Sequence, residues 1–201
     1  MISAVILAAG ESRRMGAQNK LLLPVGEEAM IRKFVKSVCA SNVDKVLVVV
    51  GHDSNNIKKV LLDQPVKFVN NPSYKEGMTT SIKSGVDAAS LESDGFMICL
   101  SDLPFVENID FNLLVSAFSN FRSEKKEALV IVPVFNGKHG NPVVFSSEFR
   151  EKILKYSGEG CHGLIEKYPN TVREVIMGNN NFFHDIDTPE DYEYIQSNIN
   201  S

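Results

Sequence analysis

Short apolar segments rich in β-branched residues alternate with amphipathic segments along nearly the whole chain. Apolar runs of this length, bounded by turn residues, are typical of strands that are buried on both faces. The predicted strands are Ala4–Ala8, Lys45–Val50, Val66–Val69, Phe96–Leu100, Leu129–Val134, Val143–Phe145 and Val172–Ile176.

The amphipathic segments between these strands predict helices. In one of them, apolar residues recur every three or four positions and fall on one helical face, as Phe111, Leu114 and Phe118 do. The predicted helices are Met30–Cys39, Ser54–Asp63, Thr80–Ala89, Asp110–Phe121, Ser147–Tyr156 and Pro189–Ile199. Strands that alternate with helices form a parallel sheet covered on both faces. The sequence therefore predicts an α/β fold, a three-layer α/β/α sandwich with a mostly parallel, Rossmann-like sheet.

The chain contains no repeat, no low-complexity segment and no Pro/Gly/Ser-rich linker. Its 201 residues, 43% of them hydrophobic, suit one domain with a sizeable core. We therefore expect a single domain over residues 1–201. The least regular segment, Phe135–Pro142, is interpreted as either a functional loop or a hairpin loop.

Charge and cysteine content narrow the functional classes. The formal net charge is -4 and no Lys/Arg-rich run offsets it, which argues against a nucleic-acid binder. The three cysteines, Cys39, Cys99 and Cys161, lie far apart, so we expect neither zinc nor disulfides. The first apolar run has no basic residue ahead of it, and no run approaches the roughly 20 residues of a membrane span. We expect a cytoplasmic protein without a signal peptide or a membrane segment.

In open α/β sheets, ligands bind beyond the carboxyl ends of the strands, so the segments that follow the strands are the candidates for function. After the first strand, the small residues Ala8–Gly10 would let backbone N–H groups approach a phosphate. Arg13, Arg14 and Lys20 add three cations nearby. The loop matches neither a Walker A motif nor a G-x-G-x-x-G fingerprint. A solvated surface loop is the alternative interpretation.

This segment reads Leu-Ala-Ala-Gly-x-Ser-x-Arg-Met-Gly and is followed by Lys-Leu-Leu. The pattern resembles the signature of the molybdenum-cofactor nucleotidyltransferases, within the wider group of sugar-nucleotide and cytidylyl transferases. The resemblance implies that Arg14 and Lys20 neutralise phosphates and act in catalysis, while Arg13 fills a variable position. The implied nucleotide-binding residues of this loop are Leu7, Ala8, Ala9, Gly10 and Ser12.

The segment after the third strand, Asn70–Gly85, resembles the family's Asn-Pro…Gly-Met-x-x-Ser segment, which embraces the base and the ribose. A loop with a helix capped by Thr79 or Thr80 is the structural alternative. The nucleotide-binding residues that the resemblance implies here are Asn71, Gly77, Met78 and Ser81. Ala9 and the Gly77–Met78 pair look like the cytidylyl branch, because guanylyl relatives carry glycine at the position of Ala9.

Two acidic residues follow other predicted strands. Asp102 comes directly after a buried strand, where an acid is well placed to hold a metal ion, although an aspartate before Pro104 is also a common turn. It aligns with the Gly-Asp-x-Pro motif of the family, whose aspartate binds Mg²⁺, with Ser101 in place of the glycine. The resemblance implies Mg²⁺, with Mn²⁺ as an alternative ion.

The second acid lies near the C-terminus, in Asp-x-Asp-Thr-Pro-Glu-Asp. Thr188 as N-cap, Pro189 at the first helical position and an acid at the third predict a helix start. The family's matching aspartate completes the metal site, which implies Asp187 as the second ligand and Asp185 as the weaker choice.

Two segments resemble acceptor-binding loops of the family. The residues implied to contact the acceptor are Gly140, Asn141 and Pro142. The segment Gly158–Lys167 departs from the family's Gly-Asp-x-Gly-Ala-Arg, so either His162 or Lys167 replaces that arginine or the contact is absent. Cys161 beside His162 suggests a thiol nucleophile, but an anionic acceptor does not need one.

The resemblance as a whole implies transfer of CMP from CTP to molybdopterin that carries molybdenum, with release of pyrophosphate. The product would serve xanthine-dehydrogenase-type hydroxylases, whose apo form is an implied partner. Two alternatives remain open: a cytidylyltransferase acting on a sugar or polyol phosphate, and a maturation chaperone that binds the molybdenum cofactor without catalysis. The pair of acids together with Lys20 and Arg14 argues against the chaperone, because binding alone needs no paired metal site.

Overall fold

The computed structural model describes residues 1–15, 18–124, 127–183 and 185–199, without the side chains of 198 and 199. Its main sheet has eight strands, and the strand order along it is β10-β7-β9-β6-β1-β4-β5, with β8 paired to β7. The strands are β1 (Ile2–Ala8), β4 (Lys45–Val50), β5 (Lys67–Asn70), β6 (Gly95–Leu100), β7 (Val130–Phe135), β8 (Lys138–His139), β9 (Val143–Ser146) and β10 (Val172–Ile176). A separate small sheet pairs β2 (Pro24–Val25) with β3 (Glu28–Ala29).

Most of the sheet is parallel. Strand β1 pairs in parallel with β4 and β6, β4 with β5, and β10 with β7. Strand β9 is antiparallel to both β6 and β7, and β8 is antiparallel to β7. The carboxyl ends of β1, β4 and β6 therefore lie along one edge of the sheet.

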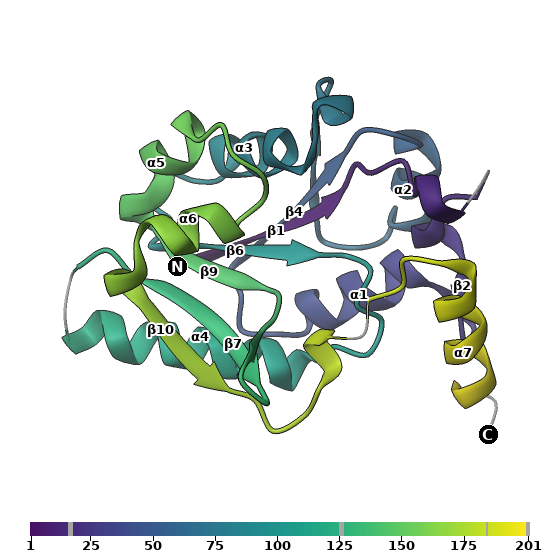
Figure 1. The fold of residues 1–201 in the computed structure, drawn as a ribbon. Coiled ribbons are helices and arrows are strands. Elements are labelled where there is room, and N and C mark those ends of the chain that lie inside the picture. Colours follow the sequence, from purple (N-terminus) through teal and green to yellow (C-terminus); the bar gives the residue numbers. More distant parts are fainter. Residues whose placement is uncertain (16–17, 125–126, 184, 200–201) are drawn as a thin grey trace.

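Helices cover both faces of the sheet (Figure 1). They are α1 (Met30–Cys39), α2 (Ser54–Val60), α3 (Met78–Ala88), α4 (Asn108–Glu124), α5 (Arg150–Lys155), α6 (His162–Lys167) and α7 (Pro189–Ile199). Buried residues of α1 and α4 belong to one hydrophobic cluster and those of α3, α5 and α6 to the other. This arrangement confirms the predicted three-layer α/β/α sandwich.

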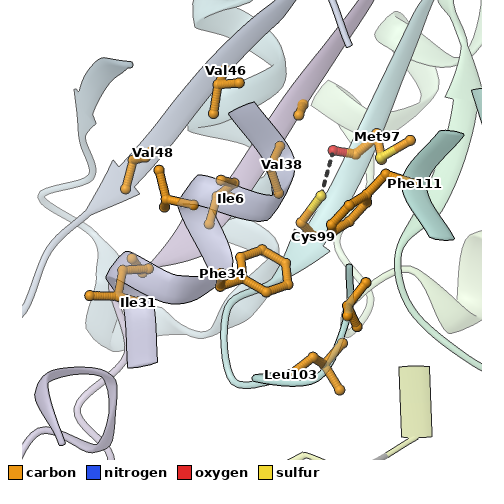
Figure 2. Close-up of a cluster of buried hydrophobic side chains, with 14 of the residues drawn as sticks. Ile6, Ile31, Phe34, Val38, Val46, Val48, Met97, Cys99, Leu103 and Phe111 are labelled. Carbon is orange, nitrogen blue, oxygen red and sulfur yellow. Dashed lines mark hydrogen bonds between the residues drawn. The ribbon is translucent and has the colours of Figure 1, made fainter. Parts of the chain in front are cut away.

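The two cores follow from the alternation of side chains along each strand. In β1, Ala4 and Ile6 contribute to the first cluster, whereas Val5 contributes to the second. Figure 2 shows the first cluster, in which Ile6 lies among side chains of α1 and α4. The rings of Phe34 and Phe111 meet there edge to face, with centroids 5.7 Å apart. Burial on both faces makes the sheet a rigid base for the loops at its edge.

The observed elements differ from the predicted ones in a few places. Helix α6 was not predicted, because a single short helix with one buried residue has too little periodicity to detect. The predicted helix Ser147–Tyr156 is divided between a 3₁₀ turn and α5. The segment Phe135–Pro142 contains a hairpin, because Asn136 and Gly137 adopt φ of 50° and 75° at the turn between β7 and β8.

No helix in the described part of the chain combines the length and the apolar character that a bilayer span requires.

The start of α3 corrects the predicted cap. The helix begins at Met78, and its N-cap is Gly77, which adopts φ 114° and makes no side-chain cap bond. The Thr80 hydroxyl instead lies 3.0 Å and 2.8 Å from the carbonyl oxygens of Ser73 and Gly77. Capping by Thr79 or Thr80 was therefore wrong, because the glycine itself supplies the required backbone conformation.

Asn71 holds this turn together. Its side chain is 2% exposed, and its Nδ2 donates to the hydroxyl oxygens of Thr80 (2.9 Å) and Ser81 (3.0 Å). Its Oδ1 accepts from the backbone N–H of Ser73 at 3.0 Å. Two of these bonds reach Thr80 and Ser81 in α3, and the third stays within the loop, so Asn71 ties the loop after β5 to the start of α3.

We expect Asn71→Ala to lower the free energy of unfolding by about 1–3 kcal/mol, because buried groups of the turn lose their partner. The neighbouring Asn70→Ala is the matched control, since Asn70 is exposed at the end of β5. It should change the free energy by less than about 0.5 kcal/mol. Urea denaturation of both variants measures the difference, and equal values for the two would contradict the structural role of Asn71.

Candidate active site

A pocket of about 580 Å³ opens at the carboxyl ends of β1 and β6 and reaches the start of α3. Most of the residues proposed from the sequence line it: Leu7, Ala9, Gly10, Ser12, Arg14, Lys20, Gly77, Met78, Ser81, Asp102, Asp185 and Asp187. Ala8 and Asn71 are buried and do not line the pocket. Gly140, Asn141 and Pro142 do not line it either. The topology therefore brings four separate segments of the chain to one place.

A chain of opposite charges crosses the pocket. The Lys20 Nζ lies 2.7 Å from Asp102 Oδ2 and 2.7 Å from Asp187 Oδ1. Arg14 Nη1 lies 2.8 Å from the other oxygen of Asp187. The Lys20 and Asp102 side chains are only 14% and 17% exposed, whereas Arg14 is 70% exposed at the mouth of the pocket. One enclosed ammonium thus joins two carboxylates that come from distant segments.

These contacts shift the pKa values of the charged groups. Burial alone would lower the pKa of Lys20, but the charges and hydrogen bonds of Asp102 and Asp187 outweigh it and raise the pKa. Burial alone would raise the pKa of Asp187, but Lys20 and Arg14 lower it. Both groups therefore carry their full charges at neutral pH, as a site for a polyphosphate and a cation requires.

The loop that carries Lys20 is fixed by its own polar residues. Ser12 adopts φ 51°, and its hydroxyl accepts from the backbone N–H of Lys20 at 3.2 Å. The Asn19 side chain accepts from the N–H of Leu21 at 3.1 Å and so caps the short turn that begins at Lys20. These bonds orient Lys20 toward the carboxylates rather than toward solvent.

Asp102 is positioned by the end of β6. The hydroxyl of Ser101 donates to the carbonyl oxygen of Leu7 in β1 at 2.7 Å, and Ser101 does not adopt a positive φ. A serine is therefore accommodated where the family carries glycine, and it adds a bond between the two strands. The second carboxylate oxygen of Asp102, Oδ1, is buried and has no hydrogen-bond partner among the described residues.

Asp187 is positioned by the start of α7. The Asp191 carboxylate accepts from the N–H of Thr188 (2.8 Å) and of Asp187 (3.1 Å), and Thr188 Oγ1 accepts from the N–H of Asp191. These reciprocal bonds form the predicted capping arrangement. The N–H of Ile186 donates to the backbone carbonyl of Asp102 at 3.1 Å, which ties the two acidic segments together.

Asp185 also lines the pocket, but the charge chain passes through Asp187. Desolvation and the nearby charge of Asp102 raise the pKa of Asp185. Its carboxylate is thus the less readily ionised of the two.

The carboxylates of Asp102 and Asp187 fit a hard divalent cation. Both donate only oxygen, and the unpartnered Oδ1 of Asp102 has a lone pair to offer a ligand. Among the described residues, no three His, Cys, Asp or Glu side chains are grouped to hold an ion. Mg²⁺ commonly takes one or two carboxylates and completes its shell with substrate phosphates and water. The oxygen donors of Asp102 and Asp187 are compatible with a site of this kind.

Most of the other residues that line the pocket are uncharged. A Cβ placed on Gly10 would meet no protein atom within 4 Å, so the backbone there is open to a ligand. The Tyr74 side chain also lines the pocket and packs against Gly51, where a Cβ would come within 2.7 Å of it. The sequence gives no indication of this position, because it depends on a contact between Tyr74 and a glycine that follows β4, far away in the chain.

Neither of the two segments that resemble acceptor-binding loops, 140–142 and 158–167, lines the pocket. Gly140 packs against Phe183, whose ring would meet a Cβ there at 2.7 Å. The hydroxyl of Thr79 donates to the carbonyl of Gly158 (2.6 Å) and accepts from the N–H of Gly160 (3.0 Å). These bonds dock the glycine-rich loop onto the start of α3, and no feature of the sequence indicated them.

The side chains proposed to replace the family's arginine lie on α6. His162 faces Glu166 at 3.5 Å, Lys167 lies over the Tyr168 ring, and neither lines the pocket. Burial raises the pKa of Cys161 to about 12, so its thiol stays protonated at neutral pH. A protonated thiol is a weak nucleophile, which agrees with the expectation that the reaction needs no thiol.

The family model of the MobA-like NTP transferase domain matches residues 4–172. The match includes Lys20 and Asp102 and ends before Asp187. Two curated relatives are similar over nearly the full chain, which is more of the chain than the family model matches. The molybdenum cofactor cytidylyltransferase of Escherichia coli is 24% identical over 95% of this chain and 93% of its own length. The purine catabolism protein PucB of Bacillus subtilis is 30% identical over 96% and 94%.

A solved structure shares the fold. A nucleotidyl transferase from Methanothermobacter thermautotroptrophicus superimposes with a TM-score of 0.84 at 22% identity, over 99% of this chain and 97% of that one. The family match covers most of the chain and includes the loop that holds Lys20 and the strand that leads to Asp102. The chain belongs to the MobA-like NTP transferase family of nucleotidyltransferases.

Proposed function

We propose that this nucleotidyltransferase transfers CMP from CTP to molybdopterin that carries molybdenum and releases pyrophosphate. The observation that carries the proposal is the set of four charges in which Lys20 bridges Asp102 and Asp187 and Arg14 contacts Asp187. A site with two carboxylates for a cation and two cations for phosphates has the composition that phosphoryl-group transfer requires.

In this reaction a terminal phosphate oxygen of the acceptor attacks the α-phosphorus of CTP. A new P–O bond forms, the bond from the α-phosphorus to the bridging oxygen breaks, and pyrophosphate leaves with that electron pair. A phosphate monoester is already anionic near neutral pH, with a second pKa of about 6, so no general base is needed. Catalysis then consists of positioning and charge neutralisation.

The residues divide these tasks by position. Asp102 and Asp187 would hold Mg²⁺, with Mn²⁺ as an alternative, and the ion would supply positive charge against the phosphate oxygens. Lys20, the enclosed ammonium between the two carboxylates, stabilises negative charge that grows at the α-phosphate. Arg14, at the exposed mouth, holds the pyrophosphate end. The backbone at Gly10 and the start of α3 face the nucleoside.

Two relatives support the choice of acceptor. One is named as a molybdenum cofactor cytidylyltransferase and the other as a purine catabolism protein. We propose that a xanthine-dehydrogenase-type hydroxylase uses the product. We propose a cytoplasmic enzyme that passes its product to such an apo-hydroxylase. The deciding experiment is incubation with each NTP and with molybdopterin, sugar phosphates or polyol phosphates, while released pyrophosphate is measured. Pyrophosphate release with a sugar or polyol phosphate, and none with molybdopterin, would replace the proposed acceptor.

We expect Asp102→Asn and Asp187→Asn each to reduce kcat by about 100-fold or more while the protein stays folded, because each removes a charge from the cation site. Pyrophosphate release at several Mg²⁺ concentrations measures the effect, and circular dichroism checks the fold. Asp94→Asn, at the opposite end of the sheet before β6, is the carboxylate control and should leave kcat unchanged. Near-normal kcat of both site variants at low Mg²⁺ would contradict the metal assignment.

Lys20→Ala and Arg14→Ala should differ in which kinetic constant they change. Lys20→Ala should lower kcat by about 100- to 1000-fold, because its ammonium meets charge that develops in the transition state. Arg14→Ala should mainly raise KM for the nucleotide, because the exposed guanidinium contacts the leaving end. Steady-state kinetics of the two variants decide between these roles. An unchanged kcat in Lys20→Ala, with only a raised KM, would reassign Lys20 to ground-state binding.

CTP should exceed GTP in kcat/KM by roughly tenfold to a hundredfold, since discrimination by pocket shape is typically worth about 1–3 kcal/mol. Ala9 lines the pocket, and we propose that its methyl group narrows the space for a purine at the first loop. Ala9→Gly should therefore raise GTP use without collapsing CTP use. Parallel kcat/KM measurements with both nucleotides test this. If neither nucleotide responds to the substitution, Ala9 does not face the base.

A further inference from the structure

Asp110 is a buried carboxylate that the proposed chemistry does not use. It lies in the first turn of α4 and is 1% exposed. Burying a carboxylate is unfavourable unless hydrogen bonds replace the water that it loses. Each of its oxygens has such a bond, and these bonds reach two different segments of the chain.

The first segment is the one that leads from Asp102 into α4. Asp110 Oδ2 accepts from the backbone N–H of Glu107 at 3.0 Å, and the N–H of Asp110 donates to the carbonyl of Glu107 at 3.1 Å. The side-chain bond is one half of a capping box, and together with the backbone bond it fixes the start of α4. It therefore orders the chain a few residues after Asp102.

The second segment is the one that leads to Asp187. Asp110 Oδ1 accepts from Asn179 Nδ2 at 2.9 Å, and Asp110 Oδ2 accepts from Asn181 Nδ2 at 3.1 Å. Asn179 in turn accepts from the N–H of Asn181 at 3.1 Å, so the turn forms one bonded unit. The neighbouring Phe182 is buried and packs against Phe111, with ring centroids 6.3 Å apart.

One carboxylate thus joins the two segments that carry Asp102 and Asp187. A second tie between the same segments is the bond from the Ile186 N–H to the Asp102 carbonyl. We infer that Asp110 is a positioning residue that sets the separation of Asp102 and Asp187, and thereby the affinity of this pair for a divalent cation. The inference rests on the proposed function, because it takes these two residues as the cation ligands.

Asp110→Asn tests the inference with little change in volume. The introduced amide nitrogen would face a donor at one of the two oxygen positions, since the side-chain partners of both oxygens are N–H donors. We expect the Kd for Mn²⁺ to rise about tenfold, as is typical when a residue that orients metal ligands is lost. Mn²⁺ titrated into the full chain without nucleotide, with the free ion followed by electron paramagnetic resonance, measures it.

A charge-conserving exchange separates positioning from loss of stability. In Asp110→Asn combined with Asn179→Asp, the introduced amide can donate to the introduced carboxylate, which restores the tie between the segments. Mn²⁺ affinity should return to within about threefold of wild type, as expected where contacting pairs couple strongly. Ile153→Ala, in the core on the other face of the sheet, is the stability control. It should lower the melting temperature without changing Mn²⁺ affinity.

Asp102→Asn distinguishes a failure of this inference from a failure of the proposed function. If Asp102→Asn weakens Mn²⁺ binding and Asp110→Asn does not, the cation site stands and the positioning role of Asp110 is overturned. If neither changes Mn²⁺ binding, both are overturned. Weakened binding in Asp110→Asn that the exchange with Asn179→Asp fails to restore also overturns the positioning role, because the tie itself would then not be the cause.

Discussion

Repulsion between two carboxylates is the constraint around which this site is built. Asp102 and Asp187 both contact one ammonium at 2.7 Å, so they lie close enough to repel each other strongly at low dielectric. Lys20 and Arg14 balance that charge without a ligand, and a cation bound there would take over part of this task. The polar groups around them, from Ser12 to Asp191, serve mainly to hold four charged groups in this geometry.

The buried sheet reduces the conformational freedom of the loops that carry these charged groups. Leu7 lies near the end of β1 and Ser101 directly follows β6, and a hydroxyl-to-carbonyl bond joins them next to Asp102 in the sequence. Because these strands are packed on both faces, the backbone that leads into each loop has little freedom. The loops then need only short-range hydrogen bonds to direct their side chains. The two apolar cores make the sheet rigid, and the loops at its carboxyl edge supply the charged side chains.

Much of this arrangement could be predicted from the sequence, because it obeys local rules. Lys20 and Asp102 follow strands, and Asp187 precedes a capped helix, so both periodicity and motifs indicated them. The contacts of Tyr74, Thr79 and Asp110 could not be predicted for a common reason. Their partners are Gly51, the Gly158–Gly160 loop and Asn179–Asn181, and no local pattern links such positions. Helix α6 could not be predicted, because its six residues are too few to show a periodic pattern of apolar positions.

The bond from Lys20 to Asp187 spans 167 positions of the chain. A chain is synthesised from its N-terminus, and early segments can begin to fold before later ones exist. Strand β1, the loop that carries Lys20, and Asp102 are therefore all made well before Asp187. During that interval Lys20 has only one of its two acidic partners, so the nascent protein holds excess positive charge at the loop. The site is therefore completed late in synthesis, and a chain that ended before Asp187 would lack the balanced charge.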